Sequence, residues 1–267
     1  MNHVGTIKEI KKINENVYSL EIFAPTVHNI LPGQYISILC EGLTLRRPFS
    51  VANFENSRIK LLIKKRGKGT EYISNLKKGD MIEFSAPLGK GFKVEKKKTL
   101  LIGAGIGVAP LFYLNKKLHK IGAETFFAAG FLGEEDIITP HPNPLPQGAR
   151  GQYDFISTDD GSNGNKGSIC DYLEKLINDF KPEKIVTCAP HPVLKLIAET
   201  AQKQGIECDV CMEKVMACGI GVCRGCVIQI KHDGKVQNAT VCKDGPVFNS
   251  AEVVWGVNGD KSGGANV

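Results

Sequence analysis

The stretch "MACGIGVCRGC", residues 216–226, constrains the fold of this chain more than any other segment. It places three cysteines among three glycines, and five of the nine cysteines of the chain lie between Cys208 and Cys226. The first residues, "MNHVGTIKEI", lack the apolar segment of a secretion signal, so we expect a soluble, cytoplasmic protein whose thiols stay reduced. Clustered thiols in such a protein more often bind a metal or serve redox chemistry than form disulfides.

Two sets of four cysteines could hold a metal centre. A zinc ribbon would use two C-x2-C pairs, Cys208, Cys211, Cys223 and Cys226. A plant-type [2Fe–2S] cluster would use a C-x4-C-x2-C motif and a fourth cysteine after fifteen more residues, which gives Cys218, Cys223, Cys226 and Cys242. The isolated Cys40 and Cys170 are expected to be small core residues.

The local pattern favours the iron–sulfur set. Residues 205–213, "GIECDVCME", alternate as a strand does, so Cys208 and Cys211 would point to opposite faces and could not share one ion. The zinc set also leaves Cys218 and the glycines unexplained. Gly219, Gly221 and Gly225 permit a loop whose backbone N–H groups point inward at sulfur.

The first third of the chain has the pattern of a small antiparallel barrel. Residues 4–92 contain short alternating stretches, such as "VYSLEIF" and "RIKLLIK", separated by turns. One stretch, "LRRPFSVAN", offers a guanidinium for phosphate, a fixed proline, an aromatic ring and a hydroxyl in Arg47, Pro48, Phe49 and Ser50. Downstream, Gly67, Gly69 and Thr70 precede a helix-like segment whose N-terminal N–H groups would suit a pyrophosphate.

A β/α pattern begins near Thr99. The apolar stretch "TLLIGAG" predicts a strand, and Gly103, Gly105 and Gly107 form the turn into a helix. A dinucleotide binds at such a turn in open α/β sheets, although Val108 departs from the G-x-G-x-x-G pattern and tight helix packing is an alternative explanation. The helix is predicted from apolar residues at helical spacing, Leu111, Leu114, Leu118 and Ile121.

Composition excludes several classes of protein. The net charge of +6 comes from scattered lysines without interleaved aromatics, so no nucleic-acid partner is expected. The longest apolar stretch, residues 100–114, is interrupted by glycines and is too short to span a bilayer. Residues 139–151 are rich in proline and predict an exposed loop, in which His141 has no nearby partner and is expected to be solvated.

Four motifs in this order, "RPFS", "GKGT", "GAGIGVAP" and "CAPHPV", resemble the ferredoxin reductase superfamily. The segments "EKVMACGIGVCRGC", "VCKDGPVFNSAEVVW" and "STDDGSNGNKG" narrow the resemblance to the electron-transfer subunits of NAD-dependent, class 1B dihydroorotate dehydrogenases. The resemblance covers nearly the whole chain, and the departures are the Pro-rich insertion and the tail after Trp255.

The resemblance implies a multidomain β and α/β fold. An antiparallel FAD-binding β-barrel would occupy residues 1–97, a parallel-sheet NAD-binding domain residues 98–207, and a small [2Fe–2S] domain residues 208–267. The implied FAD-binding residues are Arg47, Pro48, Phe49, Ser50, Leu62, Ile63, Lys64, Gly69 and Thr70. The implied NAD-binding residues are Gly103, Gly105, Gly107, Cys188 and Pro190. The implied cluster ligands are Cys218, Cys223, Cys226 and Cys242.

The chemistry of the cofactors requires a flavin between the other two. Nicotinamide accepts a hydride, which carries two electrons, whereas a [2Fe–2S] cluster passes one electron at a time, and a flavin can do either. No acid/base pair or substrate pocket for dihydroorotate is evident, and no catalytic residue is assigned.

The resemblance therefore implies an FMN-containing catalytic partner that oxidises dihydroorotate in pyrimidine (UMP) biosynthesis, with two catalytic and two electron-transfer subunits in a heterotetramer. No membrane partner is expected. Related subunits of sulfite reductases, hydrogenases and ferredoxin:NADP oxidoreductases are alternatives, although Cys218 argues against one that has an aspartate as first ligand. A zinc-stapled, non-redox binding module is an alternative of another class. Glu134 and Glu135 favour NAD over NADP.

Overall fold

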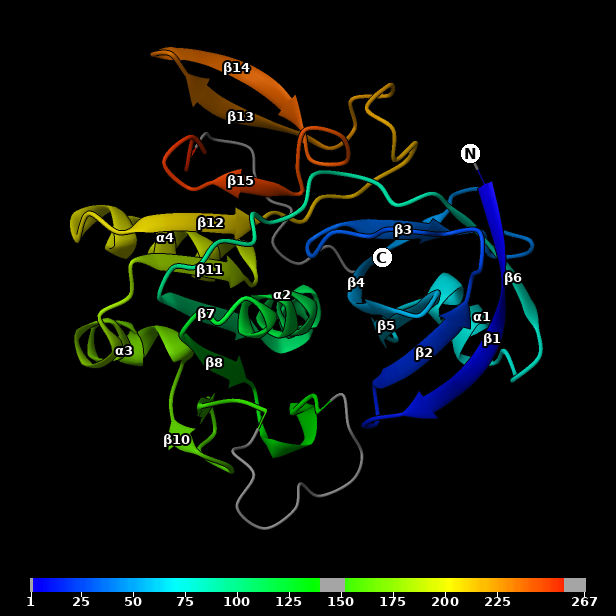
Figure 1. Ribbon diagram of the computed structural model, residues 1–267, viewed down its shortest axis with the longest axis horizontal. Coiled ribbons are helices and arrows are strands. Elements are labelled where there is room, and N and C mark those ends of the chain that lie inside the picture. Colours follow the sequence, from blue (N-terminus) through cyan, green and yellow to red (C-terminus); the bar gives the residue numbers. More distant parts are fainter. Residues whose placement is uncertain (1, 140–151, 257–267) are drawn as a thin grey trace.

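The computed structural model describes residues 2–139 and 152–256. The Pro-rich insertion beyond residue 139, with His141, and the tail beyond residue 256 lie outside the described residues. The described chain forms a closed barrel, a seven-stranded sheet and a two-stranded hairpin. Figure 1 shows the barrel on the right, the sheet on the left and the hairpin above the sheet. The predicted fold class, an antiparallel barrel followed by a parallel-sheet domain and a small C-terminal unit, is confirmed.

The barrel is antiparallel and has the strand order β1-β2-β5-β4-β3-β6, closed by pairing of β6 with both β1 and β3. The alternating stretches predicted from sequence become strands because every second side chain, such as Leu20 or Leu61, fills the barrel interior. Closure leaves the barrel without an unpaired edge. The strands are β1 (Asn2–Lys12), β2 (Val17–Phe23), β3 (Tyr35–Ile38), β4 (Arg47–Glu55), β5 (Arg58–Lys64) and β6 (Met81–Ser85).

The seven-stranded sheet has the order β10-β9-β8-β7-β11-β12-β15. All neighbours are parallel except β15, which is antiparallel to β12. The chain runs outward from β7 to β10 and then crosses back to place β11 on the other side of β7, and ligands of open α/β sheets bind at the carboxyl ends of strands at such a reversal. The strands are β7 (Thr99–Ala104), β8 (Thr125–Phe131), β9 (Phe155–Thr158), β10 (Asn165–Lys166), β11 (Lys184–Cys188), β12 (Glu207–Cys211) and β15 (Val247–Asn249).

Helices cover both faces of this sheet. Helix α2 packs on one face through Leu111, Leu114 and Leu118, while α3 and α4 pack on the other. Ile121, predicted to continue the apolar side of α2, is instead the C-cap residue and is 42% exposed, because the helix ends before it. The helices are α1 (Lys68–Ser74), α2 (Val108–Lys120), α3 (Leu173–Phe180) and α4 (His191–Lys203), with short 3-10 turns η1 (Gly105–Gly107), η2 (Glu134–Asp136) and η3 (Ile169–Tyr172).

The C-terminal segment is built into the sheet. Strand β12 extends past residue 207, the predicted end of the nucleotide-binding domain. It does so because it pairs residue by residue with β11, for example Ile185 with Cys208. Strand β15 then returns from the far end of the chain and pairs Phe248 with Val210. Between them lie β13 (Val227–His232) and β14 (Lys235–Thr240), which form the hairpin. The sheet and the C-terminal unit therefore share two strands.

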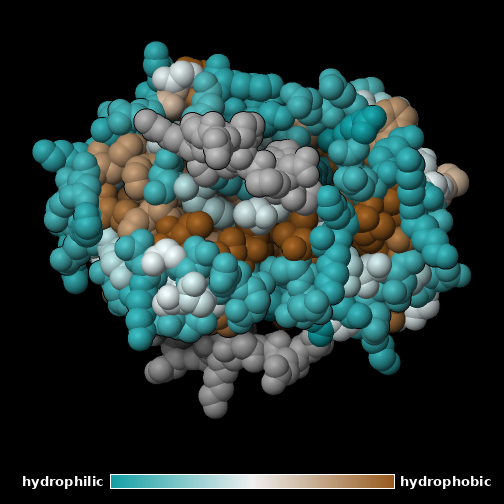
Figure 2. All heavy atoms as spheres, turned by 90° about the horizontal axis from the view of Figure 1, so that it is seen from below, coloured by the Kyte–Doolittle hydropathy of each residue, from teal (hydrophilic) through white to brown (hydrophobic). Residues whose placement is uncertain are grey.

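Polar residues cover much of the face seen in Figure 2. On the face seen in Figure 2, apolar residues gather in a band between polar margins. Among the helices of the described residues, none is both long and apolar enough to cross a membrane.

Candidate functional site

The cluster loop, residues 216–226, points backbone N–H groups at thiol sulfurs. Two of its glycines, Gly219 and Gly221, have φ values of +69° and +83°, which turn the chain around the cysteines. Each of the four cysteines expected as ligands accepts at least one backbone N–H. The donors are Gly221 to Cys242 Sγ at 3.1 Å, and Cys223 to Cys218, Gly225 to Cys223 and Cys242 to Cys226, each at 3.4 Å.

These hydrogen bonds and the burial of the thiols set their acidity. Backbone N–H groups of Cys223 and Ile220 lower the pKa of the Cys218 thiol to about 6, so it ionises readily. Burial, and then the nearby Cys226 thiol, raise the pKa of Cys242 to about 11. Cys223 is exposed at the surface, whereas Cys226 and Cys242 are buried.

The four thiols lie as two neighbouring pairs. The Cys218 thiol interacts with Cys223, and the Cys242 thiol interacts with Cys226. Within residues 2–139 and 152–256, no three His, Cys, Asp or Glu side chains converge on a single point as the ligands of one ion would. Two thiol pairs from one loop and one later segment fit a binuclear iron–sulfur group, whose two irons each need a pair of thiolates, and the inward N–H groups suit its sulfurs.

The zinc set is not brought together. Cys208 and Cys211 both lie on β12, but Cys208 is buried in the core that α3 and α4 cover, whereas Cys211 is buried in the core that α2 covers. The opposite-face prediction for these two residues is confirmed. Burial raises the pKa of Cys208 to about 12, so this thiol stays protonated. Cys40 is fully buried inside the barrel, as expected of an isolated cysteine, and Cys170 is half-buried.

The barrel brings two motifs together that are weak signals when read separately. Arg47 begins β4, and its side chain lies over Gly69 in the first turn of α1, so close that a Cβ on Gly69 would stand 2.5 Å from Arg47 Nε. Thr70 Oγ1 accepts the backbone N–H groups of Arg66 and Gly67 and fixes this turn. Residues 47–50 are half-buried in the strand. The guanidinium and the glycine turn thus form one surface suited to an anionic group.

On β5, the side chains of the residues expected beside the flavin point to opposite faces of the strand. The Ile63 side chain is buried inside the barrel, so only its main chain can line an external site. Leu62 instead packs into the core under α2, and Lys64 pairs with Asp136 at 3.6 Å. The 3-10 turn η1 contacts β5. The barrel strand and the glycine turn of the nucleotide domain are therefore direct neighbours.

The nucleotide turn, residues 103–107, lies at the carboxyl end of β7. A Cβ on Gly103 would stand 2.7 Å from Val108 Cγ1, and one on Gly107 would stand 2.1 Å from the carbonyl oxygen of Cys188. Gly105 has a φ of +53° and open space around it. The turn therefore packs directly against Cys188, the last residue of β11, which is followed by Pro190, the N-cap residue of α4.

The residues expected at the nucleotide site lie on two segments that adjoin at this reversal of the sheet. Cys188 ends β11 beside Gly103, its register partner on β7. A hydrogen bond with Cys211 and burial raise the pKa of the Cys188 thiol, which keeps it neutral. A neutral, closely packed floor at the carboxyl ends of two adjacent strands suits the flat nicotinamide end of a dinucleotide.

An acidic loop borders the same edge of the sheet. Glu134 donates its backbone N–H to Ser162 Oγ at 2.7 Å, and Asn163 Nδ2 donates to the Glu134 carboxylate at 3.3 Å. A Cβ on Gly133 would stand 2.8 Å from carboxylate oxygens of both Asp160 and Glu135. The carboxylates of Glu134, Glu135 and Asp160 therefore gather at one rim, and the preference for NAD over NADP that Glu134 and Glu135 indicate stays a prediction.

Sequence reasoning missed Tyr35. The residue lies on β3, is 2% exposed, and its hydroxyl donates toward the carbonyl oxygens of Gly219 at 3.0 Å and Cys242 at 2.9 Å. Burial raises the pKa of this phenol. The alternating pattern of "QYISI" predicts only a strand, because nothing within it shows which distant carbonyls the ring would meet.

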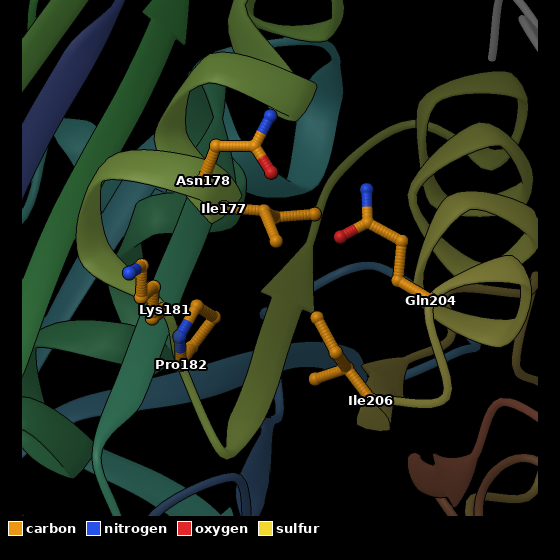
Figure 3. Close-up of a pocket in the computed structure, with 6 residues that line it drawn as sticks. All are labelled: Ile177, Asn178, Lys181, Pro182, Gln204 and Ile206. Carbon is orange, nitrogen blue, oxygen red and sulfur yellow. The ribbon is translucent and has the colours of Figure 1, made fainter.

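A surface pocket of about 270 Å³ lies away from this site. Figure 3 shows it between the ends of α3 and α4, with Ile177 and Ile206 pointing toward each other and Lys181 at the margin. Pro182 and Ile206 precede β11 and β12, so the pocket lies at the amino ends of these strands. It is at the edge of the sheet opposite the nucleotide turn.

Two family models match the chain. "Oxidoreductase FAD-binding domain" matches residues 5–92, and "Iron-sulfur cluster binding domain of dihydroorotate dehydrogenase B" matches residues 213–254. The dihydroorotate dehydrogenase B (NAD(+)), electron transfer subunit of Caldanaerobacter subterraneus subsp. tengcongensis is 37% identical over 226 residues, 84% of this chain and 87% of the relative. The subunit of the same name from Fusobacterium nucleatum subsp. nucleatum is 32% identical over 260 residues, 93% of this chain and 96% of the relative.

The fold also matches a solved structure throughout. An NADH-dependent reduced ferredoxin–NADP oxidoreductase, studied for flavin-based electron bifurcation, gives a TM-score of 0.81 at 27% identity and covers 94% of this chain and 90% of that chain. The match spans the barrel, the sheet and the C-terminal unit together.

Proposed function

Because this chain belongs to the family of electron transfer subunits of dihydroorotate dehydrogenase B, we propose that it passes electrons from a dihydroorotate-oxidising partner to NAD+. Its cofactors are FAD, an iron–sulfur cluster and NAD. When bound, the cluster supplies one-electron transfer, FAD links single electrons to electron pairs, and NAD+ takes up the hydride. The pathway served is pyrimidine biosynthesis.

One observation carries the proposal. The barrel contacts the nucleotide turn on one side, through β5 and η1, and the cluster loop on another, through Tyr35. A flavin bound at the barrel motif would then have a two-electron neighbour and a one-electron neighbour within a single chain. Neither a nicotinamide dehydrogenase nor an iron–sulfur protein alone requires this arrangement.

We assign the site residues as follows. Cys218, Cys223, Cys226 and Cys242 hold the cluster as thiolates, with backbone N–H groups directed at their sulfurs. The FAD side is assigned to Arg47, Pro48, Phe49, Ser50, Leu62, Ile63, Lys64, Gly69 and Thr70. The nucleotide side is assigned to Gly103, Gly105, Gly107, Cys188 and Pro190.

These residues act by binding and orientation. Arg47, beside the turn at Gly69, supplies positive charge for the FAD phosphates. The contact between Gly107 and the Cys188 carbonyl sets the depth of the nicotinamide site, and the packing of Leu62 into the core under α2 excludes water beneath the FAD side. The low pKa of Cys218 favours the thiolate form that iron binds.

The partner surface is assigned to the outer side of the cluster loop. Val215, Ile220 and Val222 are 66%, 57% and 76% exposed, and they lie within or just before the loop that carries the exposed Cys223. An apolar patch around the redox group lets a catalytic subunit approach the cluster closely and exclude water. We propose that this subunit contains FMN and that two copies of each subunit form a heterotetramer.

The three functional units are proposed as residues 1–97, 98–207 and 208–267, the last two joined through β12 and β15 in one sheet. A cytoplasmic location is proposed because none of the nine cysteines forms a disulfide, as is usual in a reducing compartment.

Reconstitution tests the proposed function. The purified subunit should oxidise NADH with an artificial acceptor and should not oxidise dihydroorotate by itself. Adding the catalytic subunit should produce dihydroorotate-dependent reduction of NAD+, followed at the absorbance of NADH. Dihydroorotate turnover by this chain alone would contradict the electron-transfer role.

A further inference from the structure

Tyr35 is the barrel residue that touches both segments on which the proposed cluster ligands lie. Its hydroxyl is 3.0 Å from the carbonyl oxygen of Gly219, next to Cys218, and 2.9 Å from that of Cys242. A phenol has a single proton and a pKa of about 10, so at neutral pH one O–H is shared between the two carbonyl acceptors. These two ligand segments are more than twenty residues apart in sequence, since Gly221 and Cys242 alone are separated by 21 positions.

The same residue is paired with the strand that carries the FAD motif. On the barrel, Tyr35 is the register partner of Ser50, the last residue of "RPFS". Directly opposite residues of an antiparallel pair project from the same face of the sheet, so Tyr35 and Ser50 are side-chain neighbours. On its other side the backbone of Tyr35 exchanges hydrogen bonds with Leu88 at 3.2 and 2.9 Å. The backbone that carries the ring is thus paired on both sides.

The surroundings leave the ring little freedom. Gly89 has a φ of +76°, and a Cβ there would stand 2.6 Å from Pro246 Cδ and 3.1 Å from the Tyr35 ring. The backbone N–H of Lys90 donates to the carbonyl of Gly245, which follows the fourth ligand segment. Tyr35 also lies in the same hydrophobic core as Cys226 and Cys242, although it belongs to a strand of the barrel. The barrel and the cluster unit are packed together around this one side chain.

We propose that Tyr35 is a positioning residue whose hydroxyl holds both ligand segments of the cluster at a set place against the FAD-motif strand and thereby sets the rate of electron transfer between cluster and FAD. This inference rests on the proposed function of the site. Electron transfer slows steeply as the distance between redox groups grows, so a small displacement of the cluster loop changes the rate. The residue takes no part in the chemistry at the nicotinamide.

The variant Tyr35→Phe removes the hydroxyl and keeps the ring. Tyr113→Phe is the matched control, because Tyr113 is also buried, at 1% exposure, and donates its hydroxyl to a backbone carbonyl, that of Ile30, at 3.0 Å. Both variants lose one buried hydrogen bond between parts of the chain. Only Tyr35→Phe releases the cluster loop.

Two measurements on the holoprotein separate the steps. In stopped-flow experiments with NADH, the rate of FAD reduction should be unchanged in both variants. The subsequent reduction of the cluster should slow about tenfold in Tyr35→Phe. A factor of about ten is the change in an equilibrium constant that the loss of one strong hydrogen bond produces. The EPR spectrum of the reduced cluster should change in Tyr35→Phe and match the wild type in Tyr113→Phe. Loss of the cluster, with FAD retained, in Tyr35→Phe alone would equally support the proposal.

A third measurement does not depend on electron transfer. Hydrogen exchange of the amides of residues 218–226 should be faster by about tenfold in Tyr35→Phe, since a shared hydrogen bond no longer restrains the loop. If NADH reduced the FAD of the wild-type protein but never its cluster, the proposed function would fail. Faster hydrogen exchange in Tyr35→Phe would still support the contact between Tyr35 and the loop. Unchanged exchange together with unchanged cluster reduction in Tyr35→Phe would overturn the positioning role.

Replacing Tyr35 by 4-aminophenylalanine keeps the proposal testable if Tyr35→Phe fails to fold. The amino group retains a donor at the para position of the ring. It should restore the wild-type EPR spectrum and a cluster reduction rate close to that of the wild type. A folded 4-aminophenylalanine protein with slow cluster reduction would contradict the assignment of the effect to the hydrogen bond.

Discussion

The cluster loop and the nucleotide turn are both rich in glycine, but their glycines serve different purposes. Gly219 in the cluster loop has a left-handed φ of +69°, and no atom outside its own neighbours would lie closer than 3.6 Å to an added Cβ. Gly107 in the nucleotide turn has an ordinary helical conformation, with φ of −60°, but a Cβ would stand 2.1 Å from the carbonyl oxygen of Cys188. One glycine is required for its torsion angle and the other for space.

The difference follows from what each loop must do. The cluster loop is exposed at Cys223 and curves around its own thiols, so the constraint on Gly219 is a local torsion angle. The nucleotide turn is pressed between β7 and the end of β11, so its constraint comes from a strand about eighty residues away in sequence. Substitutions should therefore affect the two regions by different amounts and in different assays.

The largest effect is expected at the thiols themselves. Cys223→Ser should abolish cluster binding, and because Cys223 is exposed the change costs no core packing. NADH oxidation with two-electron acceptors should remain, whereas dihydroorotate-dependent NAD+ reduction in the reconstituted complex should stop. Iron and acid-labile sulfide analysis measures the loss.

The control for this prediction is Cys208→Ser, whose thiol lies in the core under α4 and away from the loop. It should keep the cluster, as should Cys211→Ser, whereas substitutions of the other three proposed ligands should lose it. If the Cys223→Ser variant kept the cluster and the Cys208→Ser variant lost it, the ligand assignment would be wrong.

The next effect concerns the nucleotide turn. Gly107→Ala must push the end of β11 away, and a misplacement of about 1 Å in a reactive site can cost about a hundredfold in rate. We expect kcat/KM for NADH to fall by about that factor, while the EPR spectrum of the chemically reduced cluster stays unchanged. Steady-state kinetics with ferricyanide measures it.

Gly105→Ala is the matched variant in the same turn, since Gly105 has open space and only its φ of +53° opposes a side chain. Its effect should be much smaller than that of Gly107→Ala. Equal effects of the two changes would show that space is not the constraint in this turn.

A change at the amino ends of β11 and β12, opposite the nucleotide turn, should disturb neither the nucleotide turn nor the cluster loop. Lys184 is 3% exposed, and its ammonium lies 2.7 Å from Asp209 and 2.9 Å from Glu207 across β11 and β12. Burial alone would lower the pKa of Lys184, but these carboxylates raise it. Lys184→Met leaves Asp209 buried without its cation and should lower the free energy of unfolding by about 2 kcal/mol.

Acid should diminish this contribution. Lys97 and Lys184 lower the pKa of Glu207 to about 2. A carboxyl whose folded pKa lies below its usual value of about 4.3 stabilises the protein fully above that value and loses the effect as the pH falls toward the folded pKa. Urea unfolding should show the wild type and Lys184→Met converging between pH 4 and pH 2. A gap that widened in acid would contradict the role of the carboxylates.

The smallest effect is expected from the torsional glycine. Gly219→Ala should cost about 1–2 kcal/mol, the price of a left-handed conformation for a residue with a Cβ, without displacing any neighbour. Gly219→Asn should cost less, because asparagine tolerates this conformation. Thermal loss of the visible cluster absorbance should occur earliest in the alanine variant. The reverse order of alanine and asparagine would show that space, not torsion, limits the loop.

Much of the molecule follows from patterns that are local in sequence. Alternating residues predict β2 and β5 with the bounds that the structure shows, because every second side chain must enter the barrel. Strand alternation likewise separates Cys208 from Cys211, which removes the zinc set. The cysteine spacing points to an iron–sulfur centre because Cys218, Cys223 and Cys226 are close enough for one loop to wrap around a cluster, and Cys242 adds a fourth thiol from a later segment. The specific ligand and cofactor-binding assignments remain predictions.

Tertiary structure alone decided which distant segments meet. Four features join residues whose contact sequence periodicity does not predict. They are the pairing of β12 and β15 within the sheet, the contact of Arg47 with Gly69, the lack of space for a side chain at Gly107, and the hydrogen bonds of Tyr35. A periodic pattern specifies which face of an element is buried, but not which element buries it. That choice depends on the packing of the whole chain, and it is what places the proposed flavin site between a nucleotide turn and a cluster loop.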